Sequence, residues 1–170
     1  MRSYTGRPKF VLVRANETNG MTAANRETPE EQIRVLMKDR VRALCGRDIH
    51  ASTSRLAHGV LSFGTVKPLR YGASDAIRRR LAEWLSSFQG PIAYEVAILR
   101  IALADDVAFC HSLNRGSATR TDGARIDKWW FATVCFCKTD GNWAITHEHS
   151  SAAFDVKSCR RSLDVYALDV

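Results

Sequence analysis

The chain has 170 residues, of which 45% are hydrophobic and 25% charged, and its formal net charge is +7. This is the length of one ordinary globular domain, and no apolar run approaches the roughly 20 residues that a membrane-spanning helix requires. The basic residues are scattered, and the densest group, Arg78-Arg79-Arg80, lies on an expected helix where successive side chains point about 100° apart. We therefore expect one soluble domain that binds neither membranes nor nucleic acid.

The cysteines and the N-terminus indicate the compartment. Five cysteines, an odd number, show no paired C-x-x-C spacing. Cys135 and Cys137 share one face of an expected strand, which is poor geometry for a disulfide. The apolar run at residues 10–13 is shorter than the roughly 7–15 residues of a signal-peptide core. These features predict reduced thiols and a cytoplasmic protein.

The first helix is expected to begin at Pro29, after a flexible N-terminal extension over residues 1–28. Thr28 is a suitable cap, Pro29 fits the first helical position, and Glu31 completes a capping box. Gly46 is expected to end the helix in the left-handed conformation. The apolar stripe of this helix consists of Ile33, Leu36, Met37, Val41 and Leu44.

Two further helices and a short strand are expected before the sheet. Asp48 should cap a polar helix that runs to Ala57, and residues 60–63 predict a strand. Ser74 should cap a third helix, which Gly90-Pro91 ends. Its apolar stripe consists of Ile77, Leu81, Trp84, Leu85 and Phe88.

The second half of the chain predicts strands at 92–103, 107–115, 126–138 and 142–150. Helices followed by a meander of long strands are typical of an α+β fold. Asp140-Gly141 predicts a type I′ turn, because that turn needs positive φ at both central residues.

This two-residue turn fixes an expected register for the last hairpin. Phe136 then lies opposite Ile145, Val134 opposite His147, and Ala132 opposite His149. His147 and His149 thereby share a face with Trp143 and Ile145. A slip of one residue exchanges the two faces, and Glu148 and Asp127 would then form the acidic pair of the pocket.

The hairpin carries a pattern of Trp, Thr, Phe, Asp-Gly, Trp, Ile and His-Glu-His that resembles the SnoaL-like branch of the ketosteroid-isomerase and nuclear-transport-factor-like superfamily. The association domain of calcium/calmodulin-dependent kinase shares a shorter version. Upstream blocks at 68–71, 90–92 and 106–115 extend the resemblance over residues 29–156, followed by a tail at 157–170. The matching positions are Trp129, Thr133, Phe136, Asp140, Gly141, Trp143, Ile145, His147, Glu148, His149 and Ser151.

The resemblance implies a cone-shaped fold, in which a strongly curved antiparallel sheet carries three helices from the first half of the chain on its concave side. It also implies a conical pocket for a small hydrophobic carbonyl compound, a homodimer formed through the convex face, and no cofactor. The implied chemistry is acid–base isomerisation, cyclisation or dehydration. The alternative is a dimeric ligand-binding or association module without catalysis.

One departure bears on catalysis: where ketosteroid-isomerase-like enzymes end the short strand with a proton-abstracting Asp, this chain has Phe63-Gly64. Another base is then needed. His147 and His149 are the expected acid and base, because imidazole titrates near neutral pH, and Asp127 is a further catalytic candidate. The histidines equally fit core residues with satisfied hydrogen bonds, or a metal pair completed by His111 or a cysteine.

The other candidates would bind the substrate. A polar group would polarise the substrate oxygen, and aromatic side chains would surround a flat apolar ligand unless they only fill the core. These candidates are His58, Phe63, Trp84, Tyr94, His111, Asn114, Trp129 and Trp130.

Overall fold

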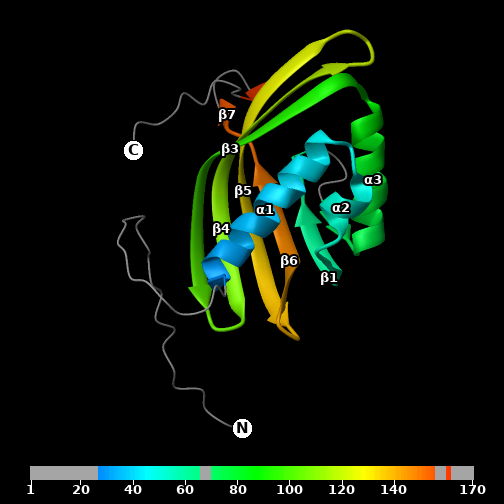
Figure 1. Cartoon of the computed structure of the whole chain (residues 1–170). Coiled ribbons are helices and arrows are strands. Elements are labelled where there is room, and N and C mark those ends of the chain that lie inside the picture. The colour runs from blue at the N-terminus through cyan, green and yellow to red at the C-terminus, as the bar shows by residue number, and fades with distance from the viewer. Residues whose placement is uncertain (1–26, 66–69, 156–159, 162–170) are drawn as a thin grey trace.

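The computed structural model describes residues 27–65, 70–155 and 160–161 (Figure 1). The expected extension at 1–28 and tail at 157–170 lie almost entirely outside these residues. In chain order the elements are α1 (Pro29–Cys45), α2 (Ile49–Thr53), β1 (Leu56–Phe63), β2 (Arg70–Gly72), α3 (Ser74–Ser86), β3 (Phe88–Ala104), β4 (Val107–Arg120), β5 (Arg125–Thr139), β6 (Asn142–Ser151), β7 (Phe154–Asp155) and β8 (Arg160–Arg161).

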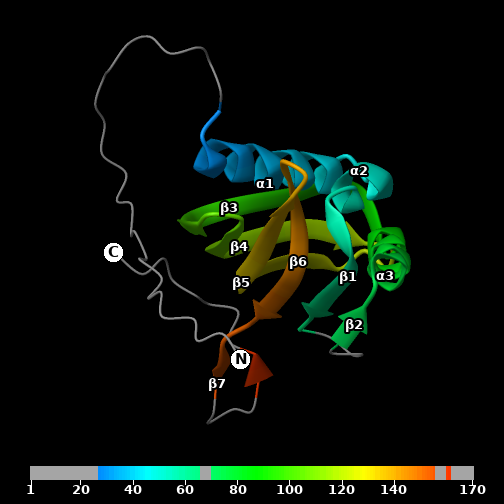
Figure 2. The ribbon, with the colours of Figure 1, turned by 90° about the horizontal axis from the view of Figure 1, so that it is seen from below.

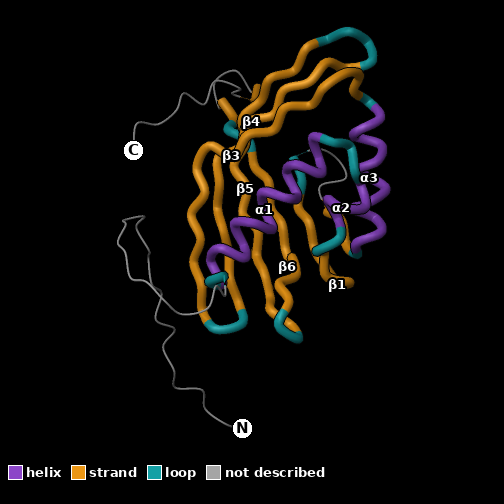
Figure 3. Tube along the Cα trace, in the orientation of Figure 1, coloured by secondary structure: helices purple, strands orange, loops and turns teal. Residues whose placement is uncertain are grey.

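The main sheet has six strands in the order β2-β1-β6-β5-β4-β3, and it is strongly curved (Figures 2 and 3). All neighbours are antiparallel except β1 and β6, which run parallel, so the sheet is mixed rather than purely antiparallel. The helix α1 crosses the concave side, and α3 lies beside β1 and β2 (Figures 1 and 2). The α+β fold with a curved open sheet is thus confirmed.

The beginning of α1 is as expected. The Glu31 amide donates to the Thr28 hydroxyl at 3.2 Å, and the Thr28 amide donates to the Glu31 carboxylate at 2.7 Å. The helix ends at Gly46 as expected, but the expected left-handed conformation is wrong there: Gly46 has φ −79°, and Arg47 takes that conformation at φ 59°. Arg47 is held there by its guanidinium, which donates to the carbonyls of Leu85, Phe88 and Gly90.

The caps of the other helices were predicted only in part. Asp48 caps α2 by accepting from the Ala51 amide at 2.8 Å, although α2 ends at Thr53. Ser74 is the first residue of α3 rather than its cap. Gly90 does not end α3: it lies in β3 with φ 67°.

Two cores hold the fold together. The larger lies between α1 and the concave face, and its fully buried residues include Ile33, Phe136 and Ile145. The smaller core lies between α3, the beginning of β3, the end of β4 and the beginning of β5. It contains Leu85, Phe88 and Ile92, with Trp84 packed against them.

A β-bulge changes the register of the last hairpin. Asp140 and Gly141 have φ 51° and 78°, and Phe136 lies opposite Ile145 as predicted. Thr146 is then an extra residue, so that Cys135 lies opposite His147 and Val134 opposite Glu148. The prediction that the two histidines share a face with Trp143 and Ile145 is therefore wrong.

Candidate functional site

An inner cleft of about 70 Å³ lies between α1 and the concave face of the sheet. One wall is the buried stripe of α1, and the other comes from β3, β4, β5 and β6. Its polar and aromatic lining residues include Arg40, Tyr94, Ser112, Asn114, Trp130 and Glu148.

A largely buried ion pair lies in this cleft. The Arg40 guanidinium donates to the Glu148 carboxylate at 2.6 Å, and the two side chains are 18% and 17% exposed. Arg40 follows Leu36 by four residues and Met37 by three, so it continues the apolar stripe of α1 toward the sheet. Glu148 faces α1 because the bulge at Thr146 shifts the alternation of β6 by one residue.

Three buried polar atoms in the described residues have no hydrogen-bond partner, and all three belong to residues that line the inner cleft. They are Arg40 Nε, Ser112 Oγ and Asn114 Oδ1. An unpaired buried polar group costs about 1–3 kcal/mol, so native proteins keep few of them outside functional sites. The cleft thus offers a nitrogen donor, a hydroxyl and a carbonyl acceptor to an incoming molecule.

Two further titratable side chains on this face, those of Tyr94 and Cys110, stay neutral. Burial raises the pKa of the Tyr94 hydroxyl to about 12 and that of the Cys110 thiol to about 11. Tyr94 is therefore a hydrogen-bond donor at neutral pH, and Cys110 is not an activated nucleophile. Trp130 packs edge-on against Tyr94 at 5.2 Å, and it crosses Gly116, where a Cβ would lie 3.1 Å from the indole.

Three of the predicted substrate-binding residues, Tyr94, Asn114 and Trp130, line the inner cleft. His149 borders it, but its ring packs edge-on against Phe63 at 5.9 Å. His147 Nδ1 lies 2.9 Å from the carbonyl oxygen of Leu61. Because a carbonyl only accepts, this nitrogen carries the proton and ties β6 to β1. Both histidine rings lie on the convex side of the sheet, opposite Glu148.

The acid Asp127 lies in another part of the sheet. It accepts two hydrogen bonds from Arg115, at 2.8 and 2.6 Å, and the Arg115 guanidinium also lies over Trp129. Asp127 precedes Thr133, the residue opposite His149, by six positions, which is about 20 Å of extended strand. The structure therefore does not bring Asp127 together with the histidines.

Three more of the residues that were expected to bind the substrate, His111, Trp84 and His58, also lie away from the inner cleft. His111 is exposed on the convex face, where it stacks on Phe109 at 6.4 Å. Trp84 packs edge-on against Phe88 in the smaller core. His58 is exposed on β1.

Neither a metal cluster nor a membrane span is present in the described part of the chain. Within residues 27–65, 70–155 and 160–161, no three His, Cys, Asp or Glu side chains are grouped so that they would hold a metal ion. In the same residues no helix is long and apolar enough to cross a bilayer.

Sequence reasoning missed Arg40 and Ser112 as lining residues, whereas Trp130 lines the cleft as one of the expected aromatic side chains. Arg40 left a signal, because a charged residue on the apolar stripe of a helix needs a buried partner. Glu148 was expected in the pocket only if the hairpin faces were exchanged, and the bulge exchanges them from His147 onward.

Comparisons place this geometry in a family. A family model described as a SnoaL-like domain matches residues 33–155. A comparison with curated proteins found no match. A nuclear-transport-factor-2-like protein of unknown function from Pseudomonas putida is similar at 28% identity, over 81% of this chain and 95% of its own, with a TM-score of 0.73.

Two more distant structures share the fold. One is a protein from Novosphingobium aromaticivorans provisionally named scytalone dehydratase, with 15% identity over 74% of this chain and 84% of its own and a TM-score of 0.63. The other is the association domain of calcium/calmodulin-dependent kinase II from C. elegans, with 12% identity, 72% and 94% coverage and a TM-score of 0.59. The family match spans most of the chain and agrees with the curved sheet that encloses the inner cleft, so this protein belongs to the SnoaL-like domain family.

Proposed function

We propose that the protein binds a small oxygen-bearing organic molecule in the inner cleft and moves a proton at its carbonyl group without a cofactor. The observation that carries this proposal is the convergence of three unpaired buried polar atoms, on Arg40, Ser112 and Asn114, into one cleft. The provisional dehydratase name of one structural neighbour supports the same kind of chemistry.

The cleft residues divide naturally into two roles. The neutral hydroxyl of Tyr94 is suited to donate to the carbonyl oxygen as negative charge develops there. The Glu148 carboxylate is suited to accept the proton from the adjacent carbon, while Arg40 holds it in place. The rings of His147 and His149 pack against Phe63 on the convex side, so we propose this assignment in place of the one expected from the sequence.

The size of the cleft limits its occupant. Its volume of about 70 Å³ is roughly half of the 150 Å³ cavity that accommodates benzene in an engineered protein. We therefore propose a ketone of a few carbon atoms, or the carbonyl end of a larger molecule, as the bound group.

Proton exchange at carbon tests this function without knowledge of the product. The protein should accelerate deuterium incorporation next to the carbonyl of butanone in D₂O, followed by proton NMR. Tyr94→Phe, which removes only the hydroxyl, should lower the rate by about 100-fold. The double variant His147→Gln, His149→Gln should keep the wild-type rate; exchange that survives in Tyr94→Phe but disappears in the histidine variant would refute the assignment.

The same assay predicts an unusual alkaline profile. Because burial raises the pKa of Tyr94 to about 12, the exchange rate should not fall as pH rises through about 10, where an ordinary tyrosine ionises. The native state holds this proton more tightly than the unfolded chain. The free energy of unfolding should therefore decrease between about pH 10 and pH 12, which urea titrations at several pH values would measure.

We further propose that the convex face pairs with a second copy of the chain. The described residues include five exposed large hydrophobic side chains, and four of them lie on this face: Phe63, Val107, Phe109 and Phe131. Exposed apolar patches of this kind mark interfaces. The similarity to a kinase association domain supports self-association as a function of its own.

Sedimentation velocity tests the dimer. The double variant Phe109→Glu, Phe131→Glu should sediment as a monomer, because a dimer of this variant would bury the introduced charges in an apolar contact. The matched control is Val35→Glu on α1, a residue that is 43% exposed on the other side of the protein and should leave a dimer intact. A monomeric wild-type protein would overturn the proposal.

A further inference from the structure

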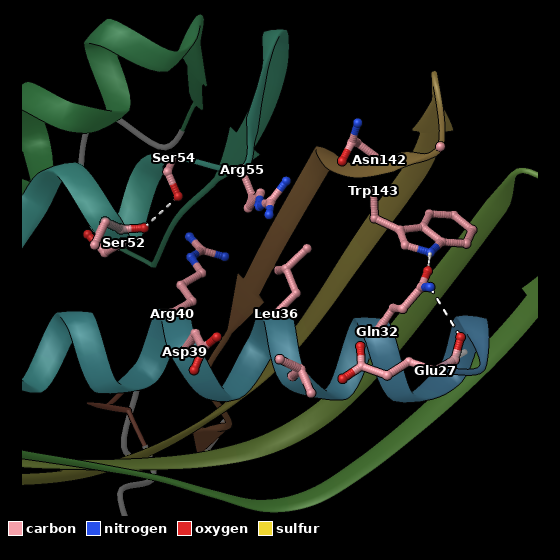
Figure 4. Close-up of a pocket in the computed structure, with 13 residues that line it drawn as sticks. Glu27, Gln32, Leu36, Asp39, Arg40, Ser52, Ser54, Arg55, Asn142 and Trp143 are labelled. Atoms are coloured by element: carbon pink, nitrogen blue, oxygen red, sulfur yellow. Dashed lines mark hydrogen bonds between the residues drawn. The ribbon is translucent and has the colours of Figure 1, made fainter. Parts of the chain in front are cut away.

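A second and larger cavity lies beside α1, toward the beginnings of β1 and β6, and is distinct from the inner cleft. This outer groove has a volume of about 450 Å³ and lies between α1, the turn from α2 into β1, and the turn between β5 and β6 (Figure 4). The two cavities share one lining residue, Arg40. A volume of this size falls within the roughly 300–1,000 Å³ of small-molecule sites.

Two arginines reach into the same end of the outer groove. Arg40 extends from α1, and Arg55 extends from the turn just before β1 (Figure 4). Arg40 gives one guanidinium nitrogen to Glu148, while its buried Nε has no partner. Arg55 has no carboxylate partner within the described residues. Arg55 thus has donors available toward the groove, and the partly exposed Arg40 guanidinium lies at the same end.

The charges of the residues at this end of the groove favour a ligand that carries a single negative charge. Glu148 offsets Arg40, and Arg42 offsets Asp39 across 3.1 Å at the groove rim. Glu27 lies at the opposite end, beside Gln32 (Figure 4). The charge of Arg55 therefore remains uncompensated at the arginine end.

The middle of the outer groove is apolar. Leu36 lines it from α1, and Trp143 lines it from the beginning of β6. The Trp143 indole N–H is already used, because it donates to the Gln32 side-chain oxygen at 3.1 Å. Trp143 thus offers apolar ring surface rather than a donor, and Leu36 lies between it and the two arginines (Figure 4).

We propose that the outer groove binds an organic acid, with its carboxylate between Arg40 and Arg55 and a short apolar stem against Leu36 and Trp143. Arginine binds carboxylates through paired, charge-assisted hydrogen bonds, and one carboxylate supplies the single charge that this end lacks. The site does not depend on the proton-transfer chemistry of the inner cleft.

NMR with ¹⁵N-labelled protein and hexanoate as the probe tests this site. The chain has four tryptophans, so each indole N–H reports on its own surroundings. Hexanoate should shift the Trp143 signal more than that of Trp130, which lines the inner cleft. Arg55→Gln should weaken hexanoate binding about tenfold, whereas 1-hexanol, which lacks the carboxylate, should bind weakly to both proteins.

The matched control is Arg79→Gln, which removes an exposed arginine from α3 and should leave hexanoate affinity unchanged. Equal affinity in wild-type and Arg55→Gln protein would overturn the proposal. So would a shift confined to Trp130, which would place hexanoate in the inner cleft. Neither result bears on butanone exchange, so failure of this site and failure of the proposed function are distinguishable.

Discussion

Replacing Glu148 with glutamine should lower the free energy of unfolding by about 2–3 kcal/mol, because the largely buried Arg40 then lacks its counter-charge. Urea denaturation of the purified protein measures this loss. The exposed pair of Glu30 and Arg34 has the same 2.6 Å separation, and Arg34→Gln should cost less than about 0.5 kcal/mol. Equal losses in the two variants would contradict this prediction, since the buried ion pair would then contribute no more to the free energy of unfolding than the exposed pair.

A double variant separates stability from function at this position. Arg40→Met combined with Glu148→Leu removes both charges and should recover most of the stability lost in Glu148→Gln, since well-packed apolar residues often replace a buried ion pair without cost. The same protein should not exchange the protons of butanone. Recovery of both properties would contradict the role proposed for Glu148.

Deleting Thr146 should remove the bulge of β6 and leave the protein folded, because Thr146 is the extra residue between the partners of Phe136 and Cys135. The residues that follow should keep their partners in β5 and therefore their faces. Glu148 should stay beside Arg40, and the rings of His147 and His149 should stay on the convex side. Thermal and urea denaturation should show a cooperative transition with a loss of about 1–3 kcal/mol.

The control for this deletion is Thr146→Ala, which keeps the length of the strand. It loses only the hydrogen bond from the Thr146 hydroxyl to the Cys135 carbonyl, 3.3 Å long, and should cost about 1 kcal/mol. A deletion variant that does not fold, beside a stable Thr146→Ala, would contradict the assignment of Thr146 as the extra residue of β6.

The sequence predicted helix caps and turns correctly where these depend on neighbouring residues. The Thr28 capping box, the Asp48 cap and the Asp140-Gly141 turn each depend on residues within a few positions of one another, and the structure has all three. The conformation of Arg47 depends instead on carbonyls about 40 positions away, which no local pattern reports.

The candidate site was harder to predict for the same reason. An alternating pattern gives the faces of a strand only while the alternation continues, and nothing in the sequence marks Thr146 as the bulged residue. The bulge reversed the faces of His147, Glu148 and His149, so the expected site lay on the wrong side of the sheet. Tyr94 and Asn114, expected to bind the substrate, do line the inner cleft, and the position of Arg40 on the apolar stripe of α1 was a further signal for it.

A crystal structure of the protein soaked with butanone would test the central claim most directly. We predict a ketone in the inner cleft, with its oxygen within hydrogen-bonding distance of the Tyr94 hydroxyl and a carbon next to the carbonyl facing Glu148. A cleft in which Arg40, Ser112 and Asn114 satisfy one another and leave no space for the ketone would contradict it.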